Sequence, residues 1–193
     1  LAEACRKAGV ARLIHVSALG VDAPSLPSRY LRSKAEGERL LLEDTALQVT
    51  ALRPSVIFGA RDRSTNLFAS LQRVAPLMPL ASAHARLQPV WVEDVAAAIV
   101  ACLDMPESIG KVYECVGPDA MSLADLVRQS GRMAGAERWV LPLPSVVGRL
   151  QAWLMECLPG EPLISRDNLD SLQVPNVASG RRPGLAALGI HAA

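Results

Sequence analysis

Tyr30 and Lys34 stand four residues apart in a segment whose apolar residues recur with the spacing of a helix. Residues four apart lie on one face of a helix, so the ammonium group of Lys34 is expected to stabilise the Tyr30 phenolate and to lower the pKa of the phenol from about 10. Such a phenol can exchange a proton with a substrate hydroxyl or carbonyl while a hydride moves to or from a cofactor. The alternative is that both side chains lie on a solvated helix face.

Ser17 is the last residue of the apolar run 12–17, which predicts a short strand buried on both faces. Open parallel sheets bind their ligands at the carboxyl ends of the strands. The Ser17 hydroxyl is therefore expected to orient the oxygen of a substrate.

The segments around these residues predict alternating helices and strands. A helix over 1–8 precedes the strand 12–17, and Ser28 caps a second helix that runs to about residue 44. The next strand, 49–53, is stopped by a proline. Helices and strands that alternate with short connections are typical of right-handed crossovers in a parallel sheet, so the predicted fold class is α/β.

The rest of the chain predicts further elements and, from Trp139 onward, a smaller appended lobe. The expected elements are a helix over 66–74, a strand over 87–92, a helix over 93–103, a strand over 111–116, a helix capped by Ser122 and an amphipathic helix over 146–158. The apolar face of the last helix is expected to pack on its own domain, with a substrate cover, a membrane surface or a docked partner as alternatives.

Composition and charge argue against several classes of protein. Half of the residues are hydrophobic, a fifth are charged and the net charge is +1, with 17 Arg and 3 Lys scattered along the chain. Without a basic stripe, nucleic acid is not an expected partner. No apolar run approaches the roughly 18 residues that span a bilayer, and no signal-peptide pattern is present. A cytoplasmic location is expected, with attachment to the periphery of the inner membrane as the alternative.

No metal site is predicted. The four cysteines are too widely spaced for a disulfide framework or a metal site, which favours a reducing compartment. His84 and His191 lie in expected loops without Cys or carboxylate partners at ligand spacing. His15 is expected to be a hydrogen-bonded core residue, and Arg53 is expected to pair with a buried carboxylate.

Four motifs in this order resemble a known family. They are Val16-Ser-Ala-Leu-Gly20, Tyr30-Leu-Arg-Ser-Lys34-Ala-Glu, Leu52-Arg-Pro-Ser-Val-Ile-Phe-Gly59 and Val90-Trp-Val-Glu-Asp-Val-Ala96. Together they are similar to an extended or atypical short-chain dehydrogenase/reductase of the NAD-dependent epimerase/dehydratase superfamily. Within it, the resemblance is closest to the bacterial relatives of the NDUFA-nine-like accessory subunit of respiratory complex I.

The resemblance implies a doubly wound, Rossmann-like parallel sheet, a cofactor that is NAD or NADP, and a small-molecule substrate. Residues 1–110 would be the C-terminal part of the dinucleotide-binding domain, and residues 111–193 a smaller substrate lobe interleaved with it. The implied catalytic residues are Ser17, Tyr30 and Lys34. The implied cofactor contacts are Tyr30, Lys34 and the nicotinamide-contacting turn Pro54, Ser55, Val56 and Ile57.

The chain also departs from the family pattern, because a Gly-rich pyrophosphate loop after a first strand is missing from it. Since the chain also begins at Leu1 in the middle of a helix-like segment, we expect it to be an N-terminally truncated piece with an incomplete sheet. Two functions follow for the parent protein. One is an NAD(P)-dependent oxidoreductase or epimerase, and the other is a non-catalytic dinucleotide-binding accessory or sensor subunit associated with a respiratory complex.

Overall fold

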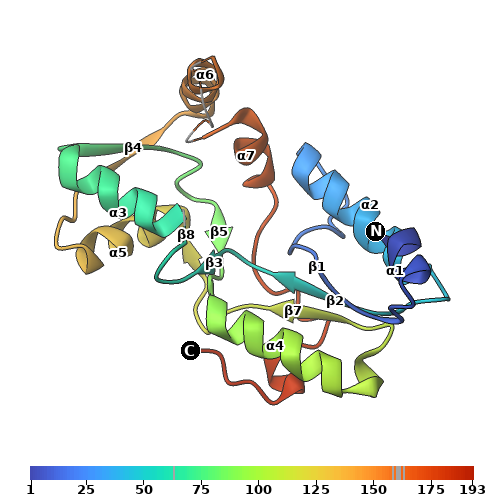
Figure 1. Cartoon of the computed structure of the whole chain (residues 1–193). Coiled ribbons are helices and arrows are strands. Elements are labelled where there is room, and N and C mark those ends of the chain that lie inside the picture. Colours follow the sequence, from blue (N-terminus) through green and yellow to red (C-terminus); the bar gives the residue numbers. More distant parts are fainter. Residues whose placement is uncertain (63, 158, 160–161, 163) are drawn as a thin grey trace.

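A computed structural model describes residues 1–62, 64–157, 159, 162 and 164–193 (Figure 1). The helices are α1 (Ala2–Lys7), α2 (Arg29–Leu42), α3 (Ser64–Val74), α4 (Val92–Asp104), α5 (Leu123–Met133), α6 (Ser145–Glu156) and α7 (Arg166–Ser171), with short 3-10 turns η1 (Pro106–Ser108) and η2 (Leu185–Leu188). The strands are β1 (Arg12–Val16), β2 (Gln48–Pro54), β3 (Ile57–Phe58), β4 (Leu77–Ala81), β5 (Arg86–Leu87), β6 (Val90–Trp91), β7 (Val112–Cys115), β8 (Met121–Ser122) and β9 (Trp139–Leu143).

Three parallel strands in the order β1-β2-β7 form the central sheet. Helices α1 and α2 lie on one face and α4 lies on the other (Figure 1). Leu52 of β2 packs with Val95 and Ala98 of α4, while Val49 of the same strand packs with Leu41 of α2. The predicted α/β class with a parallel sheet is confirmed.

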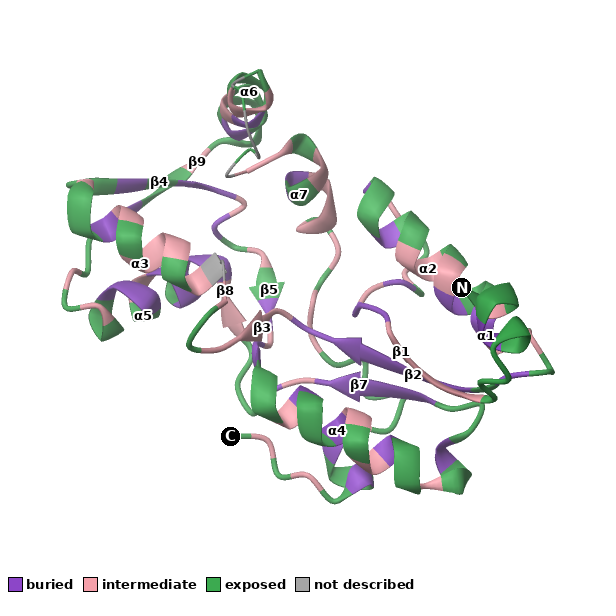
Figure 2. Cartoon of the chain, in the orientation of Figure 1, coloured by how far each residue is buried: buried purple, intermediate pink, exposed green. Residues whose placement is uncertain are grey.

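Burial differs between the strands of this sheet. From Val49 to Pro54, β2 is buried, as is all of β7, whereas every residue of β1 is only half-buried (Figure 2). The expectation that strand 12–17 is buried on both faces is therefore wrong. Within the described residues β1 is the edge strand, so only one of its sides is covered by a neighbouring strand.

A second group of strands lies beside α3 and α5 (Figure 1). Strands β4 and β9 pair in parallel, and their buried residues Met78, Leu80 and Val140 pack with Val127 of α5. Neither strand was expected, because both segments are interrupted by proline. Proline lacks an N–H group and is confined to edge strands, and within the described residues β4 and β9 pair only with each other.

The predicted strand 87–92 is divided in the structure into β5 and β6, and helix α4 already begins at Val92. Pro89 lies at the break. Its carbonyl oxygen would lie 2.1 Å from a Cβ atom at position 117, so only the glycine found there lets the two backbones pass each other. The predicted division of the chain at residue 110 stays a prediction, and β7, which follows it, pairs in the central sheet.

Helix α6 packs one narrow face on its own domain. Ala152 is fully buried, and Gly148 lies so close to Ala81 that an added Cβ would be 2.5 Å from the alanine Cβ. The large apolar side chains of the helix are exposed instead: Val146, Val147, Leu150, Trp153 and Leu154. The helix was expected to reach about residue 158, which lies outside the described residues. In the described part of the chain, no helix is long and apolar enough to cross a membrane.

Candidate active site at the carboxyl end of the sheet

The segment that follows β1 and the end of β2 lie side by side. The backbone N–H of Ser17 donates to the Leu52 carbonyl at 2.7 Å, and that of Leu19 donates to the Pro54 carbonyl at 3.1 Å. These two hydrogen bonds continue the parallel pairing beyond Val16. Ser17 and the predicted nicotinamide turn, which begins at Pro54, are therefore at the same edge of the sheet.

Helix α2 brings the other two predicted catalytic residues to this edge. The helix begins as expected, because the Ser28 hydroxyl accepts from the Leu31 N–H at 3.0 Å. The Lys34 Nζ atom donates to the carbonyl oxygen of Val16, the residue before Ser17, at 3.0 Å. The same Nζ atom lies 5.9 Å from the centroid of the Tyr30 ring. Ser17, Tyr30 and Lys34 thus come from a strand end and one helix face, while their catalytic roles stay predictions.

The Ser17 hydroxyl is a buried polar group without a partner in the part of the chain that the structure describes. Ser17 is only 2% exposed, and its Oγ atom has no hydrogen bond to the described residues. A buried hydroxyl without a hydrogen bond costs about 1–3 kcal/mol, and such groups are uncommon in folded proteins. A ligand oxygen at this position would supply the missing hydrogen bond.

The pKa of Tyr30 moves in the direction opposite to the expected one. Partial burial raises the pKa of the phenol above 10, although 48% of Tyr30 is exposed, and the expected lowering by Lys34 is wrong for this structure. The Lys34 ammonium is bonded to the Val16 carbonyl and lies near the ring centroid. At neutral pH Tyr30 is therefore protonated and can donate a proton.

His15 lies on β1, close enough to Lys34 for the charge of the ammonium to affect it. Burial lowers the pKa of His15, the charge of Lys34 lowers it further, and the charge of Glu38 opposes both. The imidazole is therefore neutral at pH 7. Its buried Nε2 atom has no hydrogen bond to the described residues, so the expectation of a hydrogen-bonded core histidine is wrong.

A buried ion-pair network underlies helix α2. The Arg53 guanidinium of β2 donates to the Glu38 carboxylate through Nε at 3.0 Å and through Nη2 at 2.6 Å. Its Nη1 atom donates to Asp22, in the loop after Ser17, at 2.7 Å. Burial alone would raise the pKa of Asp22, but the hydrogen bond and charge of Arg53 outweigh burial and lower it. The expected carboxylate partner of Arg53 is confirmed, and it joins β2, α2 and the loop after β1.

The predicted nicotinamide turn is fixed by hydrogen bonds to three other segments of the chain. The Ser55 N–H donates to the Cys115 carbonyl at 3.0 Å, and the Val56 carbonyl accepts from the Val90 N–H at 2.9 Å. The Asn176 Oδ1 atom accepts from the Ser55 hydroxyl at 2.5 Å and from the Val56 N–H at 3.2 Å. Sequence reasoning missed Asn176, since nothing in its neighbourhood indicates a partner 120 residues away.

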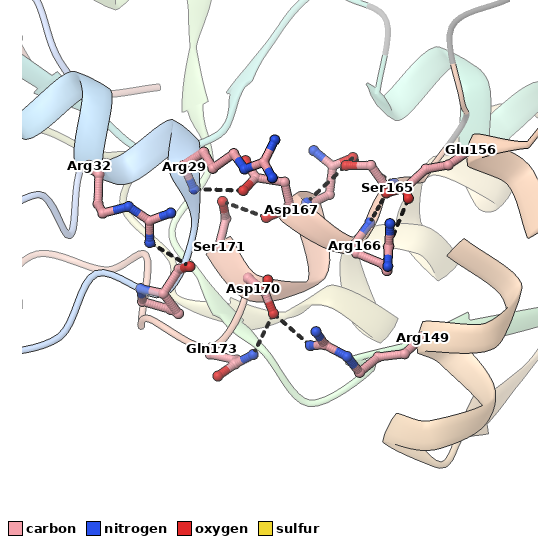
Figure 3. Close-up of polar contacts among 12 residues, drawn as sticks. Arg29, Arg32, Arg149, Glu156, Ser165, Arg166, Asp167, Asp170, Ser171 and Gln173 are labelled. Atoms are coloured by element: carbon pink, nitrogen blue, oxygen red, sulfur yellow. Dashed lines mark hydrogen bonds and ion pairs between the residues drawn. The ribbon is translucent and has the colours of Figure 1, made fainter. Parts of the chain in front are cut away.

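Helix α7 contacts the start of the helix that carries Tyr30 (Figure 3). The Asp167 carboxylate accepts from the Arg29 N–H at 2.6 Å and from the Tyr30 N–H at 3.1 Å. Orphan N–H groups in the first turn of a helix need acceptors, but the sequence alone does not say which distant side chain supplies them.

Two ion pairs join α7 to α6 in turn (Figure 3). The Arg149 guanidinium lies 2.6 Å from the Asp170 carboxylate, and that of Arg166 lies 2.8 Å from Glu156. The N-terminus of the Tyr30 helix is therefore connected through α7 to the exposed helix α6.

A cavity of about 630 Å³ opens next to the turn and is lined in part by Phe58, Trp91, Met121, Leu126 and Met133. Its lining does not include Ser17, Tyr30 or Lys34, so this cavity does not open onto the predicted catalytic residues. In the part of the chain that the structure describes, no group of three or more His, Cys, Asp or Glu side chains is placed to hold a metal ion.

Open parallel sheets bind ligands, dinucleotides among them, at the carboxyl ends of their strands, which is where Ser17 and the predicted nicotinamide turn lie. The model of the NAD(P)H-binding family matches residues 1–106, and the chain belongs to this family. Its cofactor class is therefore NAD(P), as predicted.

Two curated proteins show how far the likeness extends. NADH dehydrogenase (ubiquinone) 1 alpha subcomplex subunit 9, mitochondrial, of Mus musculus is 34% identical over 193 residues, which are 99% of this chain and 50% of that protein. Ceramide reductase of Caulobacter vibrioides is 36% identical over 146 residues, which are 74% of this chain and 44% of that protein. The chain thus spans about half the length of the curated relatives it matches.

The fold matches solved structures of the epimerase and dehydratase type. UDP-glucose 4-epimerase of Thermus thermophilus in complex with NAD superposes with a TM-score of 0.62 at 21% identity, covering 89% of this chain and 67% of that one. The predicted Rossmann-like fold is confirmed.

Proposed function

We propose that this chain forms the nicotinamide side of an NAD(P)-dependent oxidoreductase or epimerase site of the short-chain dehydrogenase type. The observation that carries the proposal is the buried hydroxyl of Ser17, which has no hydrogen-bond partner among the described residues and lies next to a carbonyl that holds the Lys34 ammonium. A strand-end hydroxyl and a nearby tyrosine can together bind one substrate oxygen. The substrate is therefore a small molecule with a carbonyl or a hydroxyl group.

The residues of this chain fit the nicotinamide half of the cofactor. Tyr30, Lys34 and the turn Pro54–Ile57 would hold it, and the orphaned Ser17 hydroxyl leaves a position for the substrate oxygen beside it. When bound, the nicotinamide supplies or accepts the hydride. Within the turn, the Val56 N–H is already taken by Asn176, so this turn would meet the ring mainly through its apolar side chains.

Proton transfer is the task of this chain's own residues. Because burial raises the pKa of Tyr30, the phenol is a proton donor toward a substrate carbonyl oxygen. Ser17 would donate a hydrogen bond to the same oxygen and orient it. The Lys34 ammonium, bonded to the Val16 carbonyl next to Ser17 and 5.9 Å from the Tyr30 ring centroid, would hold the cofactor beside the phenol.

Tyr30→Phe in the full natural protein tests the proposal, because it removes only the phenol oxygen. Turnover with a carbonyl substrate should fall by about 10²–10⁴-fold, the usual contribution of a general acid. Thermal shifts with NAD(H) and NADP(H) should persist, because Lys34 and the turn Pro54–Ile57 still hold the cofactor and a ligand that binds only the folded state raises its stability. Turnover unaffected by Tyr30→Phe would overturn the catalytic role.

A second candidate is a dinucleotide-binding accessory subunit, peripheral to the inner membrane and associated with a respiratory complex. It is favoured by the 34% identical relative, which is by name a subunit of an NADH dehydrogenase, and by the exposed apolar side chains of α6. Trp153→Ser should then release the protein from the isolated respiratory complex in a sedimentation assay and leave NADH binding intact. Under this function Tyr30→Phe has no effect on association.

A further inference from the structure

We propose that residues 165–176 form a brace that positions both halves of the site. Asp167 would position the Tyr30 helix, and Asn176 would position the nicotinamide turn. The inference rests on the proposed function and assigns it two positioning residues outside the motifs that predicted the site. Both residues act through other residues, so neither is a catalytic residue.

Asn176 is held through both its backbone and its side chain. Its backbone N–H donates to the Arg86 carbonyl at 2.9 Å and its carbonyl accepts from the Gln88 N–H at 3.0 Å, so β5 holds its backbone. Its side chain accepts from the Ser55 hydroxyl and the Val56 N–H. Because a backbone N–H can only donate, the amide atom facing Val56 is the oxygen. Asn176 thereby sets the direction of the turn's first peptide groups.

Asp167 completes the first turn of helix α2. The Ser28 hydroxyl accepts from the Leu31 N–H, and the Asp167 carboxylate accepts from the two N–H groups before it, those of Arg29 and Tyr30. A negative charge at a helix N-terminus is also favoured by the helix dipole. The position of α7 therefore sets the position of the turn that carries Tyr30.

The middle of the brace contacts the loop that follows Ser17. Val174 packs with Ala18, Val21 and Leu31, in the loop after Ser17 and at the start of α2. A Cβ atom at Gly20 would lie 2.8 Å from a Val174 methyl carbon, so the brace and this loop are in close contact. One segment of the chain thus contacts the elements that carry Ser17, Tyr30 and the nicotinamide turn.

The first test compares variants of Asn176 in the full natural protein. Asn176→Leu removes the acceptor at similar volume, Asn176→Asp keeps it, and Gln173→Ala changes an exposed amide in the same segment as a control. Asn176→Leu should raise the dissociation constant for NADH about tenfold, because the turn loses the two hydrogen bonds that the Asn176 side chain accepts from Ser55 and Val56. It should also speed amide hydrogen exchange at residues 55–57 without ligand, whereas Asn176→Asp and Gln173→Ala should match the wild type in exchange.

The second test uses Asp167→Ala, which acts on the other half of the site. Amide exchange at residues 29–31 should become faster and turnover should fall, while the dissociation constant for NADH should rise less than in Asn176→Leu. A purely structural role would instead lower thermal stability in both variants without separating cofactor affinity from turnover.

The outcomes distinguish the brace from the proposed function. A wild-type protein that binds neither NAD(H) nor NADP(H) overturns the proposed function, and hydrogen exchange without ligand then decides on the brace alone. Unchanged exchange at residues 55–57 in Asn176→Leu, or at 29–31 in Asp167→Ala, overturns the brace. Equal effects of both variants on cofactor affinity overturn the separate assignment of Asp167 and Asn176.

Discussion

Two sets of ion pairs stabilise the surroundings of helix α2, and they differ in burial. Beneath the helix, the side chains of Arg53 and Glu38 are each only 6% exposed. At its N-terminus, α7 is joined to α6 by arginines whose side chains are half exposed, 50% for Arg149 and 52% for Arg166. Water and salt screen the second set and hardly reach the first.

This difference in burial implies that the two sides of the site differ in rigidity. A buried pair whose partner is removed leaves an uncompensated charge in the protein interior, so the geometry of β2, α2 and the Asp22 loop is strongly fixed. Exposed pairs contribute little and can rearrange at low cost. We therefore expect the Lys34 side of the site to be rigid and α7 to be the more adjustable part.

Arg53→Met is expected to have the largest effect on stability. It leaves the Glu38 carboxylate buried without its partner, which should lower the free energy of unfolding by about 3–5 kcal/mol. Urea denaturation measures the loss. The double variant Arg53→Met with Glu38→Leu removes both charges and should recover most of it. A single variant as stable as the wild type would show that the pair is not buried as described.

Gly20→Ala probes the place where the loop after Ser17 meets the brace. Gly20 has φ +84°, and its added Cβ would press on Val174, so we expect a loss of about 1–3 kcal/mol. Gly9→Ala is the matched control, because Gly9 also has positive φ but no atom within 4 Å of an added Cβ. Equal losses in thermal or urea unfolding would mean that the contact with Val174 contributes nothing.

His15 makes the buried side of the site sensitive to pH. Because burial lowers the pKa of His15 from 6.5, the unfolded chain binds this proton more readily than the folded one. The contribution of His15 to stability is therefore present above pH 6.5 and is lost as the pH falls through the folded pKa. His15→Gln should remove this part of the pH dependence when unfolding is measured between pH 5 and 8. An identical slope in wild type and variant would contradict the assignment.

The sequence predicted the elements that lie close together along the chain. Ser17, Tyr30 and Lys34 belong to one strand, loop and helix, whose apolar spacing, Ser28 cap and loop prolines are readable locally. Helix α4 and strand β7 were predicted for the same reason. Strands β4 and β9 were missed because each contains a proline, and proline argues against a strand unless its edge position is known.

The contacts that complete the site were not readable from the sequence. Asp167 meets Tyr30 across 137 residues and Asn176 meets Val56 across 120, and neither residue type has a spacing that indicates its partner. The pKa of Tyr30 was predicted in the wrong direction for a related reason. Lys34 is four residues away on the helix, but the Val16 carbonyl binds its ammonium, and burial decides the shift.

Arg149→Gln should have the smallest effect. The variant removes one half-exposed partner of Asp170 and should lower the free energy of unfolding by at most about 1 kcal/mol. Because salt screens exposed charges, the difference from the wild type should shrink when unfolding is measured in about 1 M NaCl, where the Debye length is roughly 3 Å. The Arg53→Met loss should persist in the same salt, since the Arg53 pair is buried. The opposite outcome would be a loss for Arg149→Gln that equals the Arg53→Met loss and does not depend on salt. It would show that α7 is held as rigidly as the buried side, so burial would not separate the two regions.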